Sequence, residues 1–192
     1  MTPTPTPRPP ADRVVVPQYD LRAQYDAIRP EIDCAIQGVV EGGLFERGAP
    51  VQALEEAFAR FVGAQYAVSC GSGYAAIFLA LKATGLGPGD EVITVADTEN
   101  ATVAAISHTG ARPVFVDVDP RTFNMDPALI EAAITPRTKA LLPVDLYGLP
   151  CDMDAIMEVA ARRRLTVVDD ATLAVGATLR GRPVGALCPL TA

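Results

Sequence analysis

The chain has 192 residues, 49% of them hydrophobic and 20% charged, which is typical of a globular protein with a buried core. Its formal net charge of −7 disfavours nucleic acid and anionic membrane surfaces as partners. The four cysteines are far apart and His108 is the only histidine, so no metal site is predicted. No apolar run is long enough to span a membrane, and we expect a cytoplasmic protein with reduced thiols.

The N-terminal part is predicted to contain a tail and helices. Residues 1–13 alternate Thr and Pro, a composition typical of a disordered tail. Residues 14–63 form an expected helical segment, in which apolar residues recur at helical spacing over 20–37 and over 51–62. Pro30 lies inside the first of these helices, and it is expected to kink it, to break it or to begin another helix.

Residues 64–192 show strand-like segments alternating with helix-like ones. The predicted strands are short, continuous apolar runs, as in sheets covered on both faces. The pattern favours a three-layer α/β fold, with a mostly parallel sheet and helices on both faces. The predicted strands are 65–69, 91–95, 113–118, 139–144 and 165–168; the predicted helices are 73–83, 100–109, one that begins at Asp126-Pro127, and 152–164.

Ligands of parallel α/β sheets bind beyond the carboxyl ends of the strands, which directs attention to 69–74, 96–100, 145–147 and 169–173. In the first of these, the turn before residue 73 leaves the amides of Gly73, Tyr74 and Ala75 free at a helix start, where they attract an anion. A tight turn that binds nothing is the simplest interpretation.

Two ligands fit this turn. The spacing Gly71-x-Gly73-x-x-Ala76, with Asp97 after the next strand, matches a dinucleotide fingerprint and indicates NAD. Alternatively, the turn holds the phosphate of a ring cofactor, and Asp170 pairs with a protonated ring nitrogen, as pyridoxal phosphate (PLP) requires. Asp170 could instead serve as a helix cap or a structural acceptor.

Several segments match one known family in order and spacing, over nearly the whole chain after the tail. They are 17–25, 87–93, 110–119, 124–127, 134–140, 146–148, 151–154, 168–171 and 181–185. Together they resemble the DegT/StrS family of PLP-dependent sugar aminotransferases. The resemblance implies an aspartate-aminotransferase-like fold, of which 64–192 would be the N-terminal part of the PLP-binding large domain. It also implies nucleotide-linked keto sugars as substrates, glutamate or glutamine as amino donor, and a homodimer.

The resemblance assigns residues to the cofactor and shows departures. Ser72-Gly73-Tyr74 matches the family's Ser-Gly-Thr phosphate loop, and Asp170 matches the acid that faces the pyridine nitrogen. Tyr74 replaces the threonine, and Glu99 replaces the aromatic residue that stacks on the cofactor. Leu173 replaces a glutamine, so it cannot hydrogen-bond the ring oxygen.

The family's Schiff-base lysine has no counterpart in the chain. The family carries it in a Ser-Phe-x-x-x-Lys-like segment after the match to 181–185, and here the sequence stops at Ala192. The only lysines, Lys82 and Lys139, are expected on the surface. We therefore expect a truncated chain without its small C-terminal domain, with no catalytic residue and no turnover. An inactive pseudo-aminotransferase with a binding or assembly role, a dehydratase of the same family with histidine in place of the lysine, and an NAD-binding enzyme are the alternatives.

Two further residues have open roles. His108 is predicted near the end of a helix, where a cation is favoured by the helix dipole. Asp145 follows a predicted strand and could line the cofactor pocket or form a turn.

Overall fold

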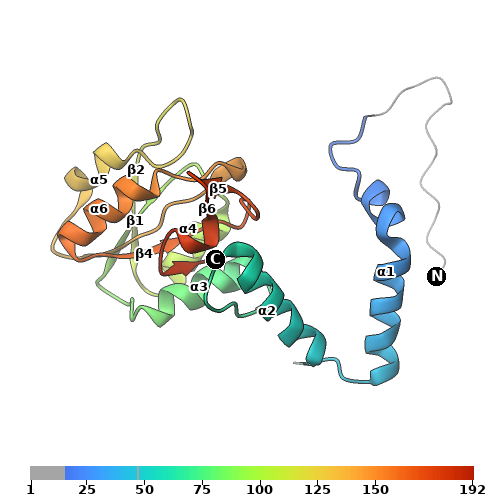
Figure 1. The fold of residues 1–192 in the computed structure, drawn as a ribbon. Helices are drawn as coiled ribbons and strands as arrows, with labels where there is room; N and C mark the ends of the chain where they lie inside the picture. The colour runs from blue at the N-terminus through green and yellow to red at the C-terminus, as the bar shows by residue number, and fades with distance from the viewer. Residues whose placement is uncertain (1–15, 47) are drawn as a thin grey trace, which may run out of the picture. The chain divides into compact units, whose positions relative to one another are not determined.

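The computed structural model describes residues 16–46 and 48–192 (Figure 1). The predicted tail, 1–13, lies outside these residues. The chain divides into two compact units, residues 1–48 and 49–192, which are described separately. The helix at residues 49–62 belongs to the second unit in this division. The expected boundary between a helical segment, 14–63, and a cofactor-binding domain, 64–192, stays a prediction.

The described residues of the first unit form the helix α1 (Leu21–Gly42). Asp20 caps its start, because a side-chain oxygen accepts a hydrogen bond from the Ala23 amide at 2.9 Å. The helix kinks at Ile28, whose φ and ψ of −120° and 18° are not helical, two residues before Pro30. It ends at Gly43, which adopts the left-handed conformation that favours glycine. The predicted kink is therefore confirmed, although the helix continues beyond residue 37.

The second unit is built on a five-stranded sheet in the order β2-β1-β3-β4-β7, in which all neighbouring pairs are parallel. The strands are β1 (Glu91–Val95), β2 (Arg112–Val116), β3 (Thr138–Leu141), β4 (Thr166–Asp169) and β7 (Leu190–Thr191). A separate antiparallel hairpin is formed by β5 (Thr178–Leu179) and β6 (Arg182–Pro183). The predicted, mostly parallel sheet is confirmed.

Helices pack against the sheet in pairs. α3 (Gly73–Ala83) packs with α4 (Asn100–His108), and α5 (Pro127–Ala133) packs with α6 (Met153–Arg163) (Figure 1). Every residue of β1 is buried, which requires cover on both faces of the sheet. α2 (Ala49–Val62) and the short helices η1 (Leu146–Gly148) and η2 (Val184–Ala186) complete the unit. The core includes Ile77, Ile93, Ile106, Leu141, Leu142 and Ile156.

The predicted strand 65–69 is wrong. This segment is irregular, and the side chains of Tyr66 and Val68 are exposed by 77% and 84%. Ser69 is held by α2 instead, because its amide and its hydroxyl both donate to Glu55 Oε1 at 2.8 Å. In the part of the chain that the structure describes, no strand lies beside these β-prone residues to complete a ladder, and propensity alone does not form one.

The other boundaries move by a few residues. β3 ends at Leu141 instead of residue 144, because Pro143 has no amide hydrogen for the ladder. A single parallel bridge from Val144 to Asp170 continues the pairing beyond Pro143. No helix among the described residues is long and apolar enough to cross a membrane.

Candidate cofactor site

The carboxyl ends of β3 and β4 are joined at Asp170. The Asp145 amide donates to the carbonyl oxygen of Asp170 at 2.9 Å, and the Asp170 amide donates to that of Pro143 at 3.0 Å. These bonds fix the backbone of Asp170 at the edge of the sheet where ligands of parallel α/β folds bind.

The predicted phosphate loop forms the start of α3. Ser72 is the N-cap: its hydroxyl accepts from the Ala75 amide at 3.1 Å, and its carbonyl oxygen accepts from Ala76 at 3.0 Å. The amides of Gly73 and Tyr74 come earlier in the first turn, where a helix supplies no acceptor. Two donors therefore remain for an anion at the positive end of the helix.

The phosphate loop contacts the segment after β4. A β-carbon built on Gly73 would lie 3.1 Å from the Thr172 methyl group, which is closer than most real contacts of this kind. The absence of a side chain at residue 73 lets Thr172 approach the start of α3. The structure thus brings together the loop and Asp170, two features that are about a hundred residues apart in sequence, a separation that parallel crossovers allow.

Asp170 is almost fully buried, with 3% exposure, and both of its carboxylate oxygens have donors. Oδ2 accepts from the Thr102 hydroxyl at 2.7 Å, and Oδ1 accepts from the Thr172 hydroxyl at 2.8 Å. The Thr102 hydroxyl also lies 2.8 Å from that of Thr98. Sequence reasoning missed Thr102. The available signal was a threonine in the first turn of a helix that begins at a strand end, one of the regions already singled out for ligands.

Tyr74 directs its ring towards α4. Its hydroxyl lies 2.6 Å from Nδ1 of His108, and its ring stacks on Phe78 with centroids 6.1 Å apart. The hydroxyl is therefore occupied away from the loop, whereas the backbone amide stays in the first turn. His108 lies in the last turn of α4, as predicted, and its contact with Tyr74 is a role that the sequence did not reveal.

The other two predicted site residues lie at the same edge with exposed side chains. Glu99 is the N-cap residue of α4, but its side chain makes no capping hydrogen bond. Leu173 is 55% exposed. Its backbone carbonyl oxygen would be 3.4 Å from a β-carbon on Gly148, so the segment after β4 packs against η1. The structure places these residues near the edge without assigning them a contact to a cofactor.

Two further carboxyl groups are buried beside Asp170. Asp145 has no exposed surface, and its Oδ1 accepts from the Cys151 amide at 2.7 Å. Burial raises the pKa of Asp145, against the lowering effect of the hydrogen bonds from Cys151. Burial and then the nearby charge of Asp145 raise the pKa of Asp169 well above its usual value. Asp145 is therefore a buried group, and it also begins the turn of η1, because its carbonyl oxygen accepts from the Gly148 amide at 3.4 Å.

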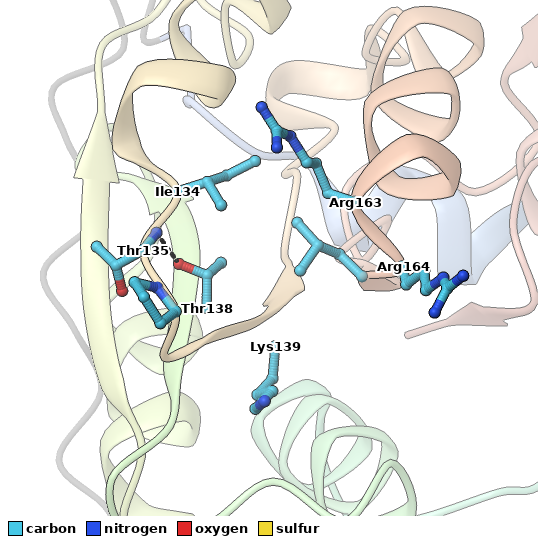
Figure 2. Close-up of a pocket in the computed structure, with 8 residues that line it drawn as sticks. Ile134, Thr135, Thr138, Lys139, Arg163 and Arg164 are labelled. Carbon is cyan, nitrogen blue, oxygen red and sulfur yellow. Dashed lines mark hydrogen bonds between the residues drawn. The ribbon is translucent and has the colours of Figure 1, made fainter.

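A cavity lies at the opposite end of the sheet. It has a volume of about 540 Å³ and is lined by residues before and at the start of β3 and β4, among them Thr138, Lys139, Arg163 and Arg164. Figure 2 shows that the charged ends of Lys139, Arg163 and Arg164 point away from one another, so they do not converge on one ligand. Lys139 is thus at the amino end of β3, as predicted, whereas Asp170 lies at the opposite, carboxyl end of the sheet, directly after β4.

The structure also bears on the metal and NAD interpretations. Across residues 16–46 and 48–192, no group of three or more metal-binding side chains comes together. In the same residues no strand leads into Gly71, although the dinucleotide fingerprint requires a strand before its glycine turn. The geometry therefore favours a phosphate loop without the dinucleotide motif.

A family model covers residues 26–192 of the sequence. The chain belongs to the DegT/DnrJ/EryC1/StrS aminotransferase family. It is 48% identical over 172 residues to a pleiotropic regulatory protein of Geobacillus stearothermophilus, a match that covers 90% of this chain and 46% of that protein. It is 47% identical over 163 residues to UDP-2-acetamido-2-deoxy-3-oxo-D-glucuronate aminotransferase of Pseudomonas aeruginosa, covering 85% and 45%.

Comparison with solved structures also finds similar proteins. DesV of S. venezuelae, in complex with a ketimine intermediate, matches with a TM-score of 0.88 and 47% identity over 89% of this chain and 46% of that one. NtdA of Bacillus subtilis, with bound cofactor PMP, matches with a TM-score of 0.86 and 35% identity over 94% and 41%. The family and the aspartate-aminotransferase-like fold are confirmed, and the chain spans about half the length of these relatives.

The residues present fit the cofactor of this family, PLP, at two points. The amides of Gly73 and Tyr74 suit its phosphate. Asp170, buried and oriented by two hydroxyl donors, suits a protonated ring nitrogen. The two points contact each other through Thr172 and Gly73.

Proposed function

We propose that this chain forms the phosphate-binding and ring-nitrogen-binding part of a PLP-dependent sugar aminotransferase. The observation that carries the proposal is the contact chain from Asp170 through Thr172 to Gly73, which connects a buried carboxylate with free amides at a helix start. When bound, PLP supplies an electron sink for amino-group chemistry.

Each residue has a distinct task in this proposal. The amides of Gly73 and Tyr74 bind the phosphate, with help from the dipole of α3. Asp170 holds a proton at the ring nitrogen. Thr102 and Thr172 orient Asp170, because each donates to a different carboxylate oxygen. Glu99 and Leu173 are proposed to face the cofactor ring from the ends of β1 and β4.

The substrate class is proposed from the relatives. Their names include aminotransferases for UDP-linked and dTDP-linked amino sugars. We propose a nucleotide-linked keto sugar as acceptor, glutamate or glutamine as donor, a homodimer as the assembly and the cytoplasm as the location. Neither lysine of the chain lies at the Asp170 edge: Lys82 is in the last turn of α3, and Lys139 is at the start of β3. We therefore expect this chain to bind cofactor without a covalent link and without turnover.

The test is titration with pyridoxamine phosphate, which requires no lysine. The chain should bind it with a shift in its absorbance, and Asp170→Asn should weaken binding about 10- to 100-fold, since a charge-assisted contact contributes roughly 1.5–3 kcal/mol. The matched control is Asp117→Asn, an exposed aspartate whose side chain bonds only its neighbouring amide. Equal affinity of Asp170→Asn and the native chain would reject the proposal. NAD binding in place of pyridoxamine phosphate would support the dinucleotide alternative.

The inactive pseudo-aminotransferase and the dehydratase share this cofactor site. An assay with a keto sugar and glutamate tests the dehydratase, because loss of water from the sugar would indicate that activity. Cofactor binding without any product is expected both of the proposed part of an aminotransferase and of a binding protein.

A further inference from the structure

Asp169 is buried, and neither of its carboxyl oxygens has a hydrogen-bond partner among residues 16–46 and 48–192. It is the last residue of β4 and has no exposed surface. Among the described residues, Oδ2 of Asp145 is also buried and unpartnered. An isolated carboxylate in such a place costs far more than a neutral carboxylic acid, because desolvation penalises the charged form.

Asp169 lies opposite Pro143 in the parallel register of β3 and β4, and Asp145 follows Pro143 by two residues, on the same face of the sheet. The titratable groups around Asp169 come from several elements. Asp145 follows β3, Cys151 precedes α6, Cys188 precedes β7, and Asp170 follows Asp169 directly. The two thiols are neutral: burial raises the pKa of Cys151 above its usual range and that of Cys188 to about 11. Each thiol also already donates to a backbone carbonyl, that of Val144 and that of Leu190. Asp145 is therefore the neighbour of Asp169 that has a buried acceptor oxygen, Oδ2, without a donor.

We propose that Asp169 and Asp145 form an acid pair that holds one proton in the folded protein, with the hydroxyl of protonated Asp169 donating to Oδ2 of Asp145. One proton satisfies an oxygen of each residue. It also leaves Oδ1 of Asp145 free to keep its bond from the Cys151 amide. Two ionised carboxylates in this position would repel each other and leave three buried oxygens without donors.

The pair acts on the candidate cofactor site through the backbone. The Asp145 amide donates to the carbonyl oxygen of Asp170, and Asp169 is its neighbour in sequence. The shared proton removes one negative charge from beside Asp170. Asp169 and Asp145 are thus positioning residues for Asp170; this consequence rests on the proposed function, whereas the acid pair itself does not.

The test uses the 192-residue chain without cofactor, so that its outcome is independent of the proposed function. An isotope-edited infrared difference spectrum with labelled aspartate at pH 7 should contain the carbonyl stretch of a protonated carboxylic acid. Asp169→Asn should abolish it. A spectrum with ionised carboxylates alone, whether a water or a cation takes the proton's place, would overturn the proposal. If Asp169→Asn does not fold, Asp145→Asn provides the assignment, because an asparagine amide can donate to ionised Asp169.

The second measurement is urea unfolding as a function of pH. A proton that is retained in the folded state and lost on unfolding lowers the folding equilibrium constant about tenfold per pH unit, from the unfolded pKa of about 3.8 up to the folded value. Because the pair holds one proton, Asp169→Asn and Asp145→Asn should each remove this whole slope, and Asp117→Asn should retain it. A slope that falls by half in each variant indicates two separate protons and rejects sharing.

Discussion

The methyl group of Thr172 occupies the space that a side chain at residue 73 would need, with 3.1 Å between it and a β-carbon built on Gly73. The same threonine donates its hydroxyl to Asp170 at 2.8 Å. Thr172 therefore lies between the phosphate loop and Asp170, the carboxylate that is proposed to hold the ring nitrogen. A change at residue 73 must reach Asp170 through Thr172.

Gly73→Ala should weaken binding of pyridoxamine phosphate about tenfold, because the new methyl group displaces Thr172 and loosens its bond to Asp170. Stability should change by no more than about 1–3 kcal/mol, the usual cost of overpacking. Titration and urea unfolding check the two effects. Gly71→Ala is the matched control, since nothing lies within 4 Å of its β-carbon position. Similar affinities for the two variants would contradict this account.

Thr102→Val should destabilise the chain by about 1–3 kcal/mol, because it leaves Oδ2 of buried Asp170 without its donor. The two side chains are nearly equal in volume, so the loss reports the hydroxyl and not packing. Urea unfolding at pH 7 measures it. Thr102→Ser keeps the hydroxyl and should recover most of the loss; a serine variant as unstable as the valine variant would show that the methyl group matters instead.

The lowered pKa of Glu91 predicts how the stability of the chain changes in acid. Its side chain, 1% exposed, accepts hydrogen bonds from Thr135, Arg112 and Arg137, which lower its pKa to about 2. The folded state therefore favours the ionised form. The stability that this carboxylate contributes is fully present above the unfolded pKa of 4.5 and is lost as the pH falls from there towards about 2.

Glu91→Gln should accordingly lower the urea midpoint at pH 7 and reduce the loss of stability between pH 4.5 and pH 2. Unfolding curves over this range measure both effects. Glu158→Gln serves as the control, because Glu158 forms only an exposed pair with Arg162. The expectation fails if the two variants respond to acid alike.

Tyr74→Phe should leave the affinity for pyridoxamine phosphate unchanged within about twofold, since the backbone amide is the proposed phosphate ligand. It removes the hydroxyl that lies 2.6 Å from Nδ1 of His108, at a cost of about 0.5–1.5 kcal/mol in stability. Titration and thermal unfolding separate the two effects. A large loss of affinity in Tyr74→Phe would place the hydroxyl at the phosphate and overturn the observed direction of the ring.

Local patterns determined most of the elements and the class of fold. Asp20, Ser72, Asp126 and Asp152 cap the helices that follow them, because a short polar side chain satisfies first-turn amides whatever surrounds it. The strand-like runs predicted at 91–95 and 165–168 correspond to β1 and, shifted by one residue, to β4. The order and spacing of the motifs indicated the family, which the match over residues 26–192 confirmed.

Only the tertiary structure decided which of these patterns are used and what they contact. The run at 65–69 has strand-forming residues, but a ladder also requires a neighbouring strand, and none lies beside it in the described residues. The parallel strands β1, β3 and β4 end at one edge of the sheet, where residues distant in sequence come within hydrogen-bonding range. This arrangement gives their roles to Thr102, Asp145 and Asp169. Burial and the availability of donors are properties of that assembled edge, so the sequence could indicate Asp170 but not the groups that orient it or the unpartnered acids behind it.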